Sequence, residues 1–368
     1  MRPVLLGFFL LLGVMRSASP EPPPLKEAFA RDFDMGVACA SLASLSPEER
    51  ALIVREFKVI TPGSHFKPDH TQPAEGRFTF EQADALVDFA QSNGLAVVGH
   101  TLAWHNQTPA WFFADGPNPA SRELLLKRLR DHIHAVVGRY RGRVKGWDVV
   151  NEGLSDKSDE YLRPNKWQQM VGDDYIAQAF AFAQEADPGA ELYFNDYGTE
   201  YPHKRAKLIR LVKELQARGI RIDGVGIQCH LQLDRIPFEE LEQSIAAFHA
   251  LGVKVMITEL DLDLVERLVW GADTTQHEEP TATNLGWKVA PPELLQRQAE
   301  QYAQLFRIFR RQHAAVDRVT IWHLHDGKSF LNNWPVKGRT NHPLLFDRHL
   351  QPKPAFDAVL AVASEPRS

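Results

Sequence analysis

Cysteine is scarce in this chain, whose 368 residues include only Cys39 and Cys229. A protein of this length can bury a large hydrophobic core, so it needs no disulfide framework to stay folded. Each cysteine falls in a segment with the pattern of a buried strand, and the two segments are far apart in the expected order of strands. We therefore predict two free, buried thiols, with a disulfide between them as the alternative.

An excess of charge of either sign is also missing. The chain has 42 Lys and Arg against 47 Asp and Glu, which gives a formal net charge of −5. Such a balance gives little attraction to nucleic acid or to an anionic membrane surface, so a neutral partner is the simplest expectation. Hydrophobic residues make up 44% of the chain, enough for the core of an ordinary globular protein.

Long apolar runs are absent except at the N-terminus. Arg2 precedes an apolar run over 4–15, and small residues follow up to position 19. This run is too short to span a bilayer and is typical of a secretory signal peptide, which we predict over 1–19. An uncleaved membrane anchor is the alternative. The proline-rich stretch over 20–27 predicts a stiff tether. We expect a secreted or periplasmic protein with no membrane contact beyond the signal segment.

From about residue 33, eight short apolar segments alternate with helical patterns. We expect strands over 33–39, 57–62, 95–101, 144–152, 191–196, 223–230, 253–260 and 318–324. We expect helices over 46–57, 81–94, 123–140, 204–219 and 293–312, the first with a capping box formed by Ser46 and Glu49.

This alternation predicts an α/β fold, a single (β/α)₈ TIM barrel domain over 28–362 that is followed by a C-terminal tail over 363–368. A doubly wound open sheet is the alternative, but that fold requires a glycine-rich phosphate loop after its first strand. No such loop follows the segment 33–39.

The segment 262–292, which follows the seventh predicted strand, is long and contains Trp270 and Trp287. In a barrel, a long segment after a strand overhangs the face that holds the active site, so we predict that it forms a wall of the cleft. A solvated insertion without contact to a ligand is the alternative.

Two glutamates stand where an apolar strand segment meets a polar one. Glu152 closes the segment 144–152, and Glu259 closes the segment 253–259. A carboxylate at the end of a buried strand is costly unless it is paired or used. In a barrel the active site lies at the carboxyl ends of the strands. Paired carboxylates there suit glycoside hydrolysis, in which one attacks the anomeric carbon and the other protonates the leaving oxygen.

Other polar and aromatic residues also gather at or near the predicted strand ends, among them Asn195, Asp196 and His323. Saccharide binding calls for aromatic platforms and for amide and imidazole groups that contact hydroxyls. For a single tryptophan, packing in the core is the commoner fate, but the set as a whole favours sugar binding. Its members are Trp104, Trp322, Tyr197, Phe330, Asn151, Gln107, Gln228, His100 and His230.

Several motifs resemble those of the glycoside hydrolase family 10 endo-β-1,4-xylanases, over nearly all of 28–362. The most specific are WDVVNE (147–152) and ITELDL (257–262). The others are GHTLAWHNQTPAW (99–111), FNDYG (194–198), GVGIQCHL (224–231), TIWHLHDGKSF (320–330) and PLLFD (343–347), in an order and spacing that also fit.

The resemblance implies a retaining mechanism with Glu152 as the acid/base and Glu259 as the nucleophile, whose carboxyl groups would lie about 5–5.5 Å apart. The implied substrate is β-1,4-xylan or xylo-oligosaccharides. We expect no cofactor, no metal and a monomeric enzyme.

The resemblance also implies roles for neighbours of the two glutamates. Asn151 would bond the sugar 2-hydroxyl at the cleavage subsite, a contact that tightens in the transition state. His230, held by Asp261, would orient Glu259 and keep the pKa of that carboxyl low enough for it to stay ionised. Without its place in the motif, His230 would be interpreted as a satisfied core histidine.

Further residues are placed around the sugar by the same resemblance. Gln228 and Tyr197 would set the environment of Glu152 and of the sugar. Trp322 would form the floor of the glycone side. The residues lining that side would be His100, Trp104, Gln107 and Lys67.

Two departures from the family pattern concern the sugar-binding cleft. After the second strand the family has a Pro-Glu-Asn-Glu-Met-Lys run, whose Glu and Asn bond the sugar at the second glycone subsite. Here Gly63 and Ser64 stand at those two positions, while Lys67 is kept. Each lost sugar bond would remove on the order of 1–3 kcal/mol. Phe330 replaces a Trp, which keeps an apolar wall but loses the indole N–H.

These departures predict a weakened or reshaped second glycone subsite with added room beside Gly63. The enzyme would then accept a substituted backbone sugar there, or depend on contacts on the aglycone side. A glycosidase of the same barrel that is specialised for substituted xylan or for short oligosaccharides is the corresponding alternative.

Two alternatives belong to other classes of protein. One is a non-catalytic sugar-binding barrel, against which the presence of both glutamates argues. The other is a metal-dependent hydrolase, although short histidine pairs arise often and carry no fixed pattern of supporting residues. Its candidate ligands would be His323 with His325, His100 with His105, and Asp261 with Asp263.

Overall fold

The structure is a computed structural model that describes residues 22–267, 271 and 276–367. The predicted signal peptide over 1–19 and Trp270 lie outside the described residues. The folded part begins within the predicted tether, with the one-turn helix α1, Leu25–Ala28. Leu25 is fully buried and its backbone N–H donates to Glu56 Oε2 at 2.9 Å, so the domain begins slightly earlier than position 28.

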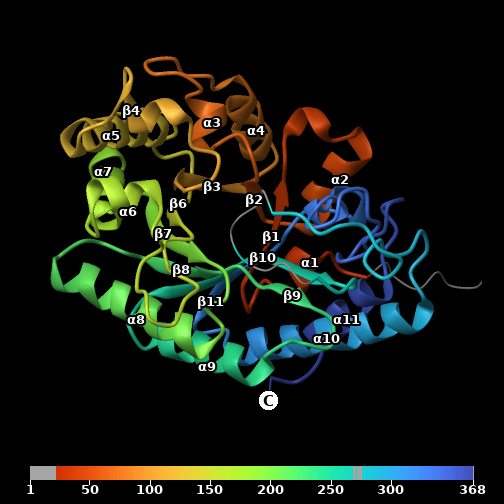
Figure 1. Cartoon of the computed structure of the whole chain (residues 1–368). Helices are drawn as coiled ribbons and strands as arrows, with labels where there is room; N and C mark the ends of the chain where they lie inside the picture. Colours follow the sequence, from red (N-terminus) through yellow and green to blue (C-terminus); the bar gives the residue numbers. More distant parts are fainter. Residues whose placement is uncertain (1–21, 268–270, 272–275, 368) are drawn as a thin grey trace, which may run out of the picture.

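The strands form a closed parallel barrel, as predicted (Figure 1). They span β1 Asp34–Cys39, β2 Val59–Pro62, β3 Ala96–Ala103, β4 Ala114–Asp115, β5 Asn118–Pro119, β6 Gly146–Asn151, β7 Glu191–Asp196, β8 Gly224–Ile227, β9 His230–Gln232, β10 Lys254–Asp263 and β11 Val316–Ile321. In space the barrel runs β1-β2-β3-β6-β7-β8-β10-β11, and β11 pairs with both β10 and β1, which closes it. Strand β9 extends the sheet along the end of β10, and β4 and β5 form a separate antiparallel pair.

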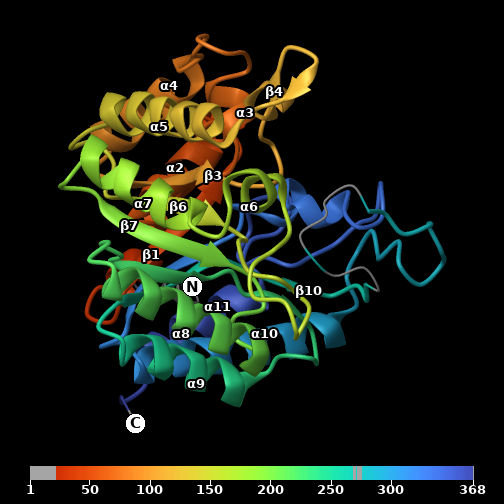
Figure 2. The same cartoon turned by 60° about the vertical axis from the view of Figure 1, so that its left-hand side comes forward.

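Helices form an outer layer around the strands, with α8, α9 and α10 along the lower side of Figure 1 and α4 and α5 along the upper side (Figures 1 and 2). The helices span α2 Pro47–Glu56, α3 Pro68–Thr71, α4 Glu81–Ser92, α5 Arg122–Arg139, α6 Lys166–Val171, α7 Tyr175–Ala186, α8 Pro202–Ala217, α9 Phe238–His249, α10 Pro292–Arg311 and α11 Pro354–Ala363. Short 3₁₀ turns cover η1 Leu42–Ser44, η2 Ala110–Phe113, η3 Asp326–Lys328 and η4 Phe330–Asn332.

All five predicted helices are present, with ends that differ by no more than two residues. Helix α2 begins with the predicted capping box: Ser46 Oγ accepts from the Glu49 N–H at 3.2 Å, and Glu49 Oε2 accepts from the Ser46 N–H at 2.6 Å. Helices α7, α9 and α11 are missing from the sequence prediction. Helices α7 and α11 each carry one charged residue, so the polar stripe that marks a surface helix is weak in them.

The prediction of one continuous strand over 223–230 is wrong at its end. Strand β8 stops at Ile227, and Cys229 has a left-handed backbone with φ 58° before β9 begins at His230. Glu152 likewise follows β6 with φ 57°. A left-handed residue interrupts the two-residue alternation of a strand, so the side chains beyond it no longer follow that pattern.

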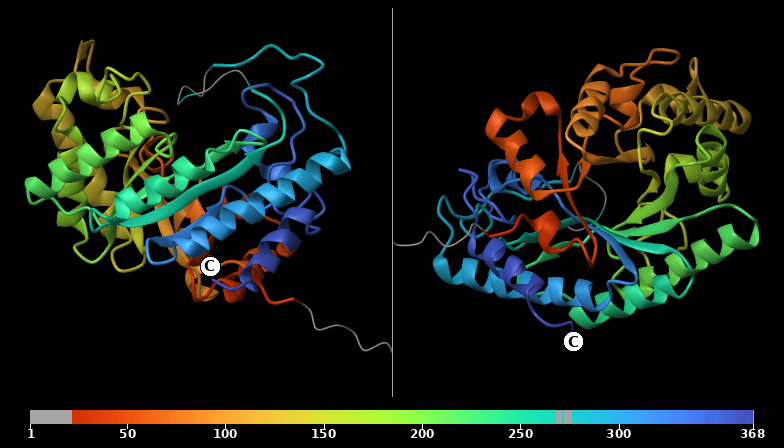
Figure 3. Two further views of the ribbon diagram at one scale, coloured as in Figure 1. Left: turned by 90° about the horizontal axis from the view of Figure 1, so that it is seen from below. Right: turned by 180° about the vertical axis from the view of Figure 1, so that it is seen from behind.

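The core lies between the strands and the helices, and a small separate cluster joins Val59, Val98, Tyr193 and Met256 from four barrel strands. Both cysteines are free and buried, as predicted. The C-terminal end of the described chain returns to its start (Figure 3): Arg367 Nη2 lies 2.8 Å from Asp32 Oδ1. Across residues 22–267, 271 and 276–367, no helix combines the length and the apolar character needed to cross a membrane.

Candidate active site

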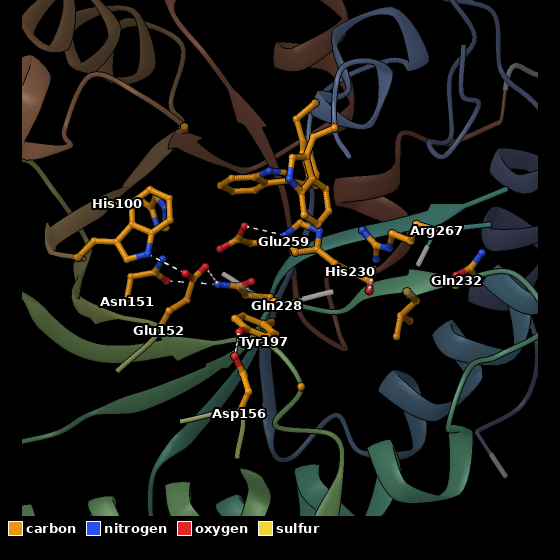
Figure 4. A pocket seen from close by; sticks show the side chains of 18 of the residues that line it. His100, Asn151, Glu152, Asp156, Tyr197, Gln228, His230, Gln232, Glu259 and Arg267 are labelled. Atoms are coloured by element: carbon orange, nitrogen blue, oxygen red, sulfur yellow. Dashed lines mark hydrogen bonds and ion pairs between the residues drawn. The ribbon is translucent and has the colours of Figure 1, made fainter. Parts of the chain in front are cut away.

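A cavity of about 990 Å³ opens where the barrel strands end, and Figure 4 shows part of its lining. The structure brings nearly all of the predicted site residues together there. Those that line it are Gly63, Ser64, Lys67, His100, Trp104, Gln107, Asn151, Glu152, Tyr197, Gln228, His230, Glu259, Trp322 and Phe330. Asp261 lies behind this surface and is fully buried.

Glu152 is buried and accepts two hydrogen bonds from the cavity wall. Trp104 Nε1 donates to its Oε2 at 2.7 Å, and Gln228 Nε2 donates to its Oε1 at 3.1 Å. Burial raises the pKa of Glu152, and the charge of Glu259 raises it further, while the two donors act in the opposite direction. The net result is a pKa above the usual range, which favours a protonated carboxyl that can donate a proton.

Glu259 is equally buried, but its pKa is shifted in the opposite direction. Burial by itself would raise the pKa, but the hydrogen bond and the positive charge of His230, together with His100 and the hydrogen bond from Asn195, outweigh burial and lower it. His230 Nε2 lies 3.0 Å from Glu259 Oε2, and Asn195 Nδ2 donates to Glu259 Oε1 at 2.8 Å. Glu259 is therefore held as a carboxylate beside a carboxyl that favours its proton.

His230 stands between two carboxylates, Glu259, which Figure 4 shows beside it, and the buried Asp261. Its Nδ1 lies 3.0 Å from Asp261 Oδ2, while its Nε2 faces Glu259. Burial lowers the pKa of His230, but the ion pairs and hydrogen bonds with the two carboxylates prevail and raise it to about 10. The ring is thus an imidazolium that donates from both nitrogens, because neither carboxylate oxygen can donate.

Asn195, at the end of β7, links the groups around both glutamates. Its Nδ2 donates to Asn151 Oδ1 at 2.9 Å as well as to Glu259, and Thr258 Oγ1 donates to its Oδ1 at 2.7 Å. A Cβ on Gly226 would lie 2.3 Å from Asn195 Oδ1, so only glycine leaves room for this amide. The sequence placed Asn195 at a strand end but gave it no role in the site.

Asn151 also receives a bond from Gln228 Nε2 at 3.3 Å. Because its amide oxygen accepts from two protein donors, its Nδ2 is the group directed to a ligand in the cavity. Glu152, Gln228, Asn151, Asn195 and Glu259 therefore form one connected hydrogen-bond network.

The predicted glycone side is organised around Lys67. Its Nζ donates to Gln107 Oε1 at 2.8 Å and lies 4.7 Å from the centre of the Trp104 ring. Burial lowers the pKa of Lys67, against the charges of Glu259 and Glu152. His100 also lines the cavity, and its Nδ1 lies 2.9 Å from Asp148 Oδ2.

Tyr197 makes no hydrogen bond to Glu152. Its hydroxyl donates to Asp156 Oδ2 at 2.5 Å and accepts from Arg163 Nη2 at 2.7 Å. Arg163 Nε in turn donates to the backbone oxygen of Glu152 at 2.9 Å, so the link to Glu152 is indirect. Lys204 Nζ lies 3.7 Å from the centre of the Tyr197 ring. Sequence reasoning missed Asp156 and Arg163, because loop positions carry no periodic signal. It also missed Lys204, which lies in the first turn of α8, where the helical pattern does not indicate a role in the site.

Aromatic rings close the other side of the cavity. The Trp322 ring lies edge-on to His100 and His230, with ring centres 5.6 and 6.2 Å apart. Phe330 packs against His230 at 5.2 Å and against Trp334 at 6.0 Å. Trp334 also lines the cavity, although it was not among the residues predicted from the sequence.

The described part of the long segment after β10 reaches the cavity, as predicted for a cleft wall. Arg267, Gly271 and His277 are among the lining residues. Trp287 instead packs against the hydrophobic core.

The candidate metal ligands do not converge. His325 Nε2 lies 2.7 Å from Glu49 Oε1, away from His100, and His323 Nδ1 bonds the Trp322 carbonyl at 2.9 Å. No group of three His, Cys, Asp or Glu side chains suited to hold a metal ion occurs in the described part of the chain. The geometry therefore favours a site whose chemistry comes from its two glutamates.

A model of the family described as "Glycosyl hydrolase family 10" matches residues 24–362. The chain belongs to this family. An endo-1,4-β-xylanase of Geobacillus stearothermophilus is 41% identical over 342 residues, which is 92% of this chain and 98% of that protein. The β-1,4-xylanase of Dictyoglomus thermophilum is 40% identical over 96% of this chain and 95% of its own length.

Solved structures of family members agree with the fold. A family 10 endoxylanase from a sugarcane soil metagenome has a TM-score of 0.87 at 36% identity and covers 92% of this chain and 99% of its own. The structure of a mutant protein in complex with xylotriose has a TM-score of 0.84 at 35% identity, and the match covers 92% of this chain and 99% of that chain. The protein is therefore a glycoside hydrolase with the fold of this family.

Proposed function

We propose that this chain is a retaining endo-1,4-β-xylanase in which Glu259 is the nucleophile and Glu152 is the acid/base. The observation that carries the proposal is the opposite perturbation of two carboxyl groups in one cavity. Burial and Glu259 raise the pKa of Glu152, whereas His230 and the other neighbours of Glu259 together prevail over burial and lower the pKa of Glu259. Groups whose environments separate their pKa values in this way take the acid and base roles.

In the first step, a Glu259 carboxylate oxygen attacks the anomeric carbon while the bond from that carbon to the leaving oxygen breaks. Glu152 gives its proton to the leaving oxygen, which departs as a hydroxyl group. In the second step, the Glu152 carboxylate removes a proton from water, the water oxygen bonds the anomeric carbon, and Glu259 is released. Retention follows from two inversions at the same carbon.

The surrounding residues serve these two steps. The His230 imidazolium keeps Glu259 ionised, and Asn195 fixes its second oxygen. Trp104 and Gln228 hold the Glu152 carboxyl group and stabilise its ionised form between the steps. The Asn151 amide donates to the 2-hydroxyl of the sugar at the cleavage subsite, where such bonds strengthen in the transition state.

Xylan and xylo-oligosaccharides are the proposed substrates. Relatives that are about 40% identical over most of this chain bear the name endo-1,4-β-xylanase or β-1,4-xylanase, and one solved relative holds xylotriose. We further propose that the second glycone subsite is modified at Gly63 and Ser64, which line the cavity. The space there would admit a substituted backbone sugar, or leave binding to depend more on the aglycone side.

The subsite proposal is tested by the double substitution Gly63→Glu and Ser64→Asn. A Cβ on Gly63 would lie 3.5 Å from the nearest neighbouring atom, the Cys39 oxygen, so a side chain fits without displacing the backbone. The expected result is a higher kcat/KM on linear xylo-oligosaccharides and a smaller preference for arabinosylated or glucuronosylated xylan. An unchanged kcat/KM on linear substrates counts against the subsite proposal and leaves the two-glutamate chemistry untouched.

The chemistry is tested by Glu152→Ala, assayed on xylan and on an aryl xylobioside with a good leaving group. Loss of a general acid lowers the rate by about 10²–10⁴-fold on xylan, whereas the activated substrate still forms the glycosyl-enzyme. Azide then restores turnover and yields a β-glycosyl azide, because it needs no base to attack. Glu300→Gln, on the exposed side of α10, is the matched control and keeps full activity. If Glu152→Ala formed no β-glycosyl azide, the acid/base role of Glu152 would be refuted.

The proposed enzyme acts outside the cytoplasm as a monomer. The signal segment over 1–19 supports export. N-terminal sequencing of protein recovered from the medium or the periplasm would locate the cleavage site, and sedimentation would give the oligomeric state.

A further inference from the structure

His323 lies in the cavity wall, yet the two-step chemistry gives it no part. It stands two residues after the end of β11, next to Trp322, and its backbone has φ 90°. This value lies in the left-handed half of backbone space and beyond the usual left-handed helical region, where a side chain with a Cβ is strained. Glycine would occupy the same backbone without that strain.

Strain of this kind persists where surrounding contacts enforce it, and it concentrates at sites that use it. Two other non-glycine residues with positive φ, Gln107 and Glu152, also line this cavity. Both contact other lining side chains through hydrogen bonds, with Lys67 and with Trp104 respectively. The strained backbone of His323 thus belongs to the same functional surface.

The tautomer of His323 is fixed by its neighbour. Nδ1 lies 2.9 Å from the carbonyl oxygen of Trp322, which can only accept, so Nδ1 carries the proton. Burial lowers the pKa of the ring to about 4, and the charge of Lys67 lowers it as well. A neutral ring protonated at Nδ1 offers Nε2 as a hydrogen-bond acceptor. Within the described residues, no protein donor reaches Nε2, and the side chain is only part-buried.

We propose that His323 Nε2 accepts a hydrogen bond from a sugar hydroxyl on the glycone side, which makes His323 a specificity-determining residue of this enzyme. The inference rests on the proposed xylanase function. The side is set by neighbours in the cavity lining: Trp322, the adjacent residue, is the predicted floor of the glycone side, and Lys67, predicted to line that side, borders the same cavity.

Three substitutions separate this role from a structural one. His323→Gly removes both the ring and the backbone strain. His323→Asn keeps a residue that tolerates positive φ but is too short to reach the position of Nε2. His323→Gln places an amide oxygen near the position of Nε2. Each is assayed on an aryl xylobioside, whose sugars occupy only the glycone side, and each melting temperature is recorded.

The expected kcat/KM falls about three- to tenfold for the Gly and Asn variants, the loss of one hydrogen bond to a neutral group. The Gln variant retains more activity than either. The Gly variant melts no lower than the parent protein and about 1–3 °C higher, because the strain is released. Lower activity with equal or higher stability is the pattern that a structural role cannot produce.

Unchanged kcat/KM in the Gly and Asn variants overturns the inference, as does a loss of activity that follows a loss of stability. A loss seen only with long substrates that fill the aglycone side overturns it as well. A parent protein that hydrolyses neither xylan nor the xylobioside would refute the proposed function first. An active parent with unaffected variants refutes only the role of His323.

Discussion

Replacing His230 with asparagine should move the acid limb of the kcat/KM profile to higher pH. The enzyme reacts only when Glu259 is ionised, so activity falls as the pH drops below the pKa of Glu259. His230 lowers that pKa through a contact of 3.0 Å, while burial acts to raise it. Without the imidazolium, burial prevails and Glu259 protonates at a higher pH.

The magnitude follows from the type of bond. A hydrogen bond to a charged group contributes about 1.5–3 kcal/mol, which corresponds to a loss of about 10- to 100-fold in kcat/KM on the acid limb. The loss diminishes as the pH rises and Glu259 ionises again. His230 itself stays charged over this range because its pKa is about 10.

The assay is the pH dependence of kcat/KM on an aryl xylobioside for the parent, His230→Asn and Asp261→Asn. Asp261→Asn is the matched control, because His230 keeps its contact with Glu259 but loses one of its two carboxylate partners. It should shift the limb in the same direction by a smaller amount. If kcat/KM fell by the same factor at every pH and the acid limb stayed at its original pH, His230 would not control the pKa of Glu259 electrostatically.

Two further predictions concern single hydrogen bonds and buried groups. Trp104→Phe removes the N–H donor that lies 2.7 Å from Glu152 Oε2 and that lowers the pKa of Glu152. The pKa of Glu152 should therefore rise, and the alkaline limb of the kcat/KM profile should move to higher pH. An alkaline limb at the same or a lower pH would contradict this prediction. His132 is fully buried with a pKa lowered to about 3, so the unfolded chain takes up its proton first and stability is lost as the pH falls from about 6.5 toward 3. Between pH 7 and 4.5 the loss amounts to roughly 2–3 kcal/mol, and His132→Gln should lose correspondingly less in urea unfolding at the two pH values. If the parent and His132→Gln lost equal unfolding free energy between the two pH values, His132 would not be the source of the loss.

The barrel could be predicted because its signals are local. Apolar strands such as 191–196 and a capping box such as that of Ser46 are written in consecutive residues. The end of the strand after Ile227 could not be predicted, because the left-handed backbone at Cys229 depends on packing around a fully buried residue. Helix α7 was not predicted, because its nearly uniform apolar composition leaves no polar stripe that would mark a surface helix.

The site shows the same division. Glu152 and Glu259 could be found because a carboxylate at the end of an apolar strand is conspicuous. Asn195 was visible as a polar residue at a strand end, but its bridging role depends on the space left by Gly226 in the neighbouring strand. The backbone of His323 is decided by contacts that no sequence pattern records.

The central claim is that Glu259 forms a covalent bond with the sugar while Glu152 does not. A 2-fluoro xylobioside with a good leaving group should form a stable ester on the enzyme, because the fluorine slows the second step. Peptide mass spectrometry after digestion should then show one fluoroxylobiosyl group, on the peptide that contains Glu259. An ester on Glu152, or inactivation without any covalent label, would contradict the assignment.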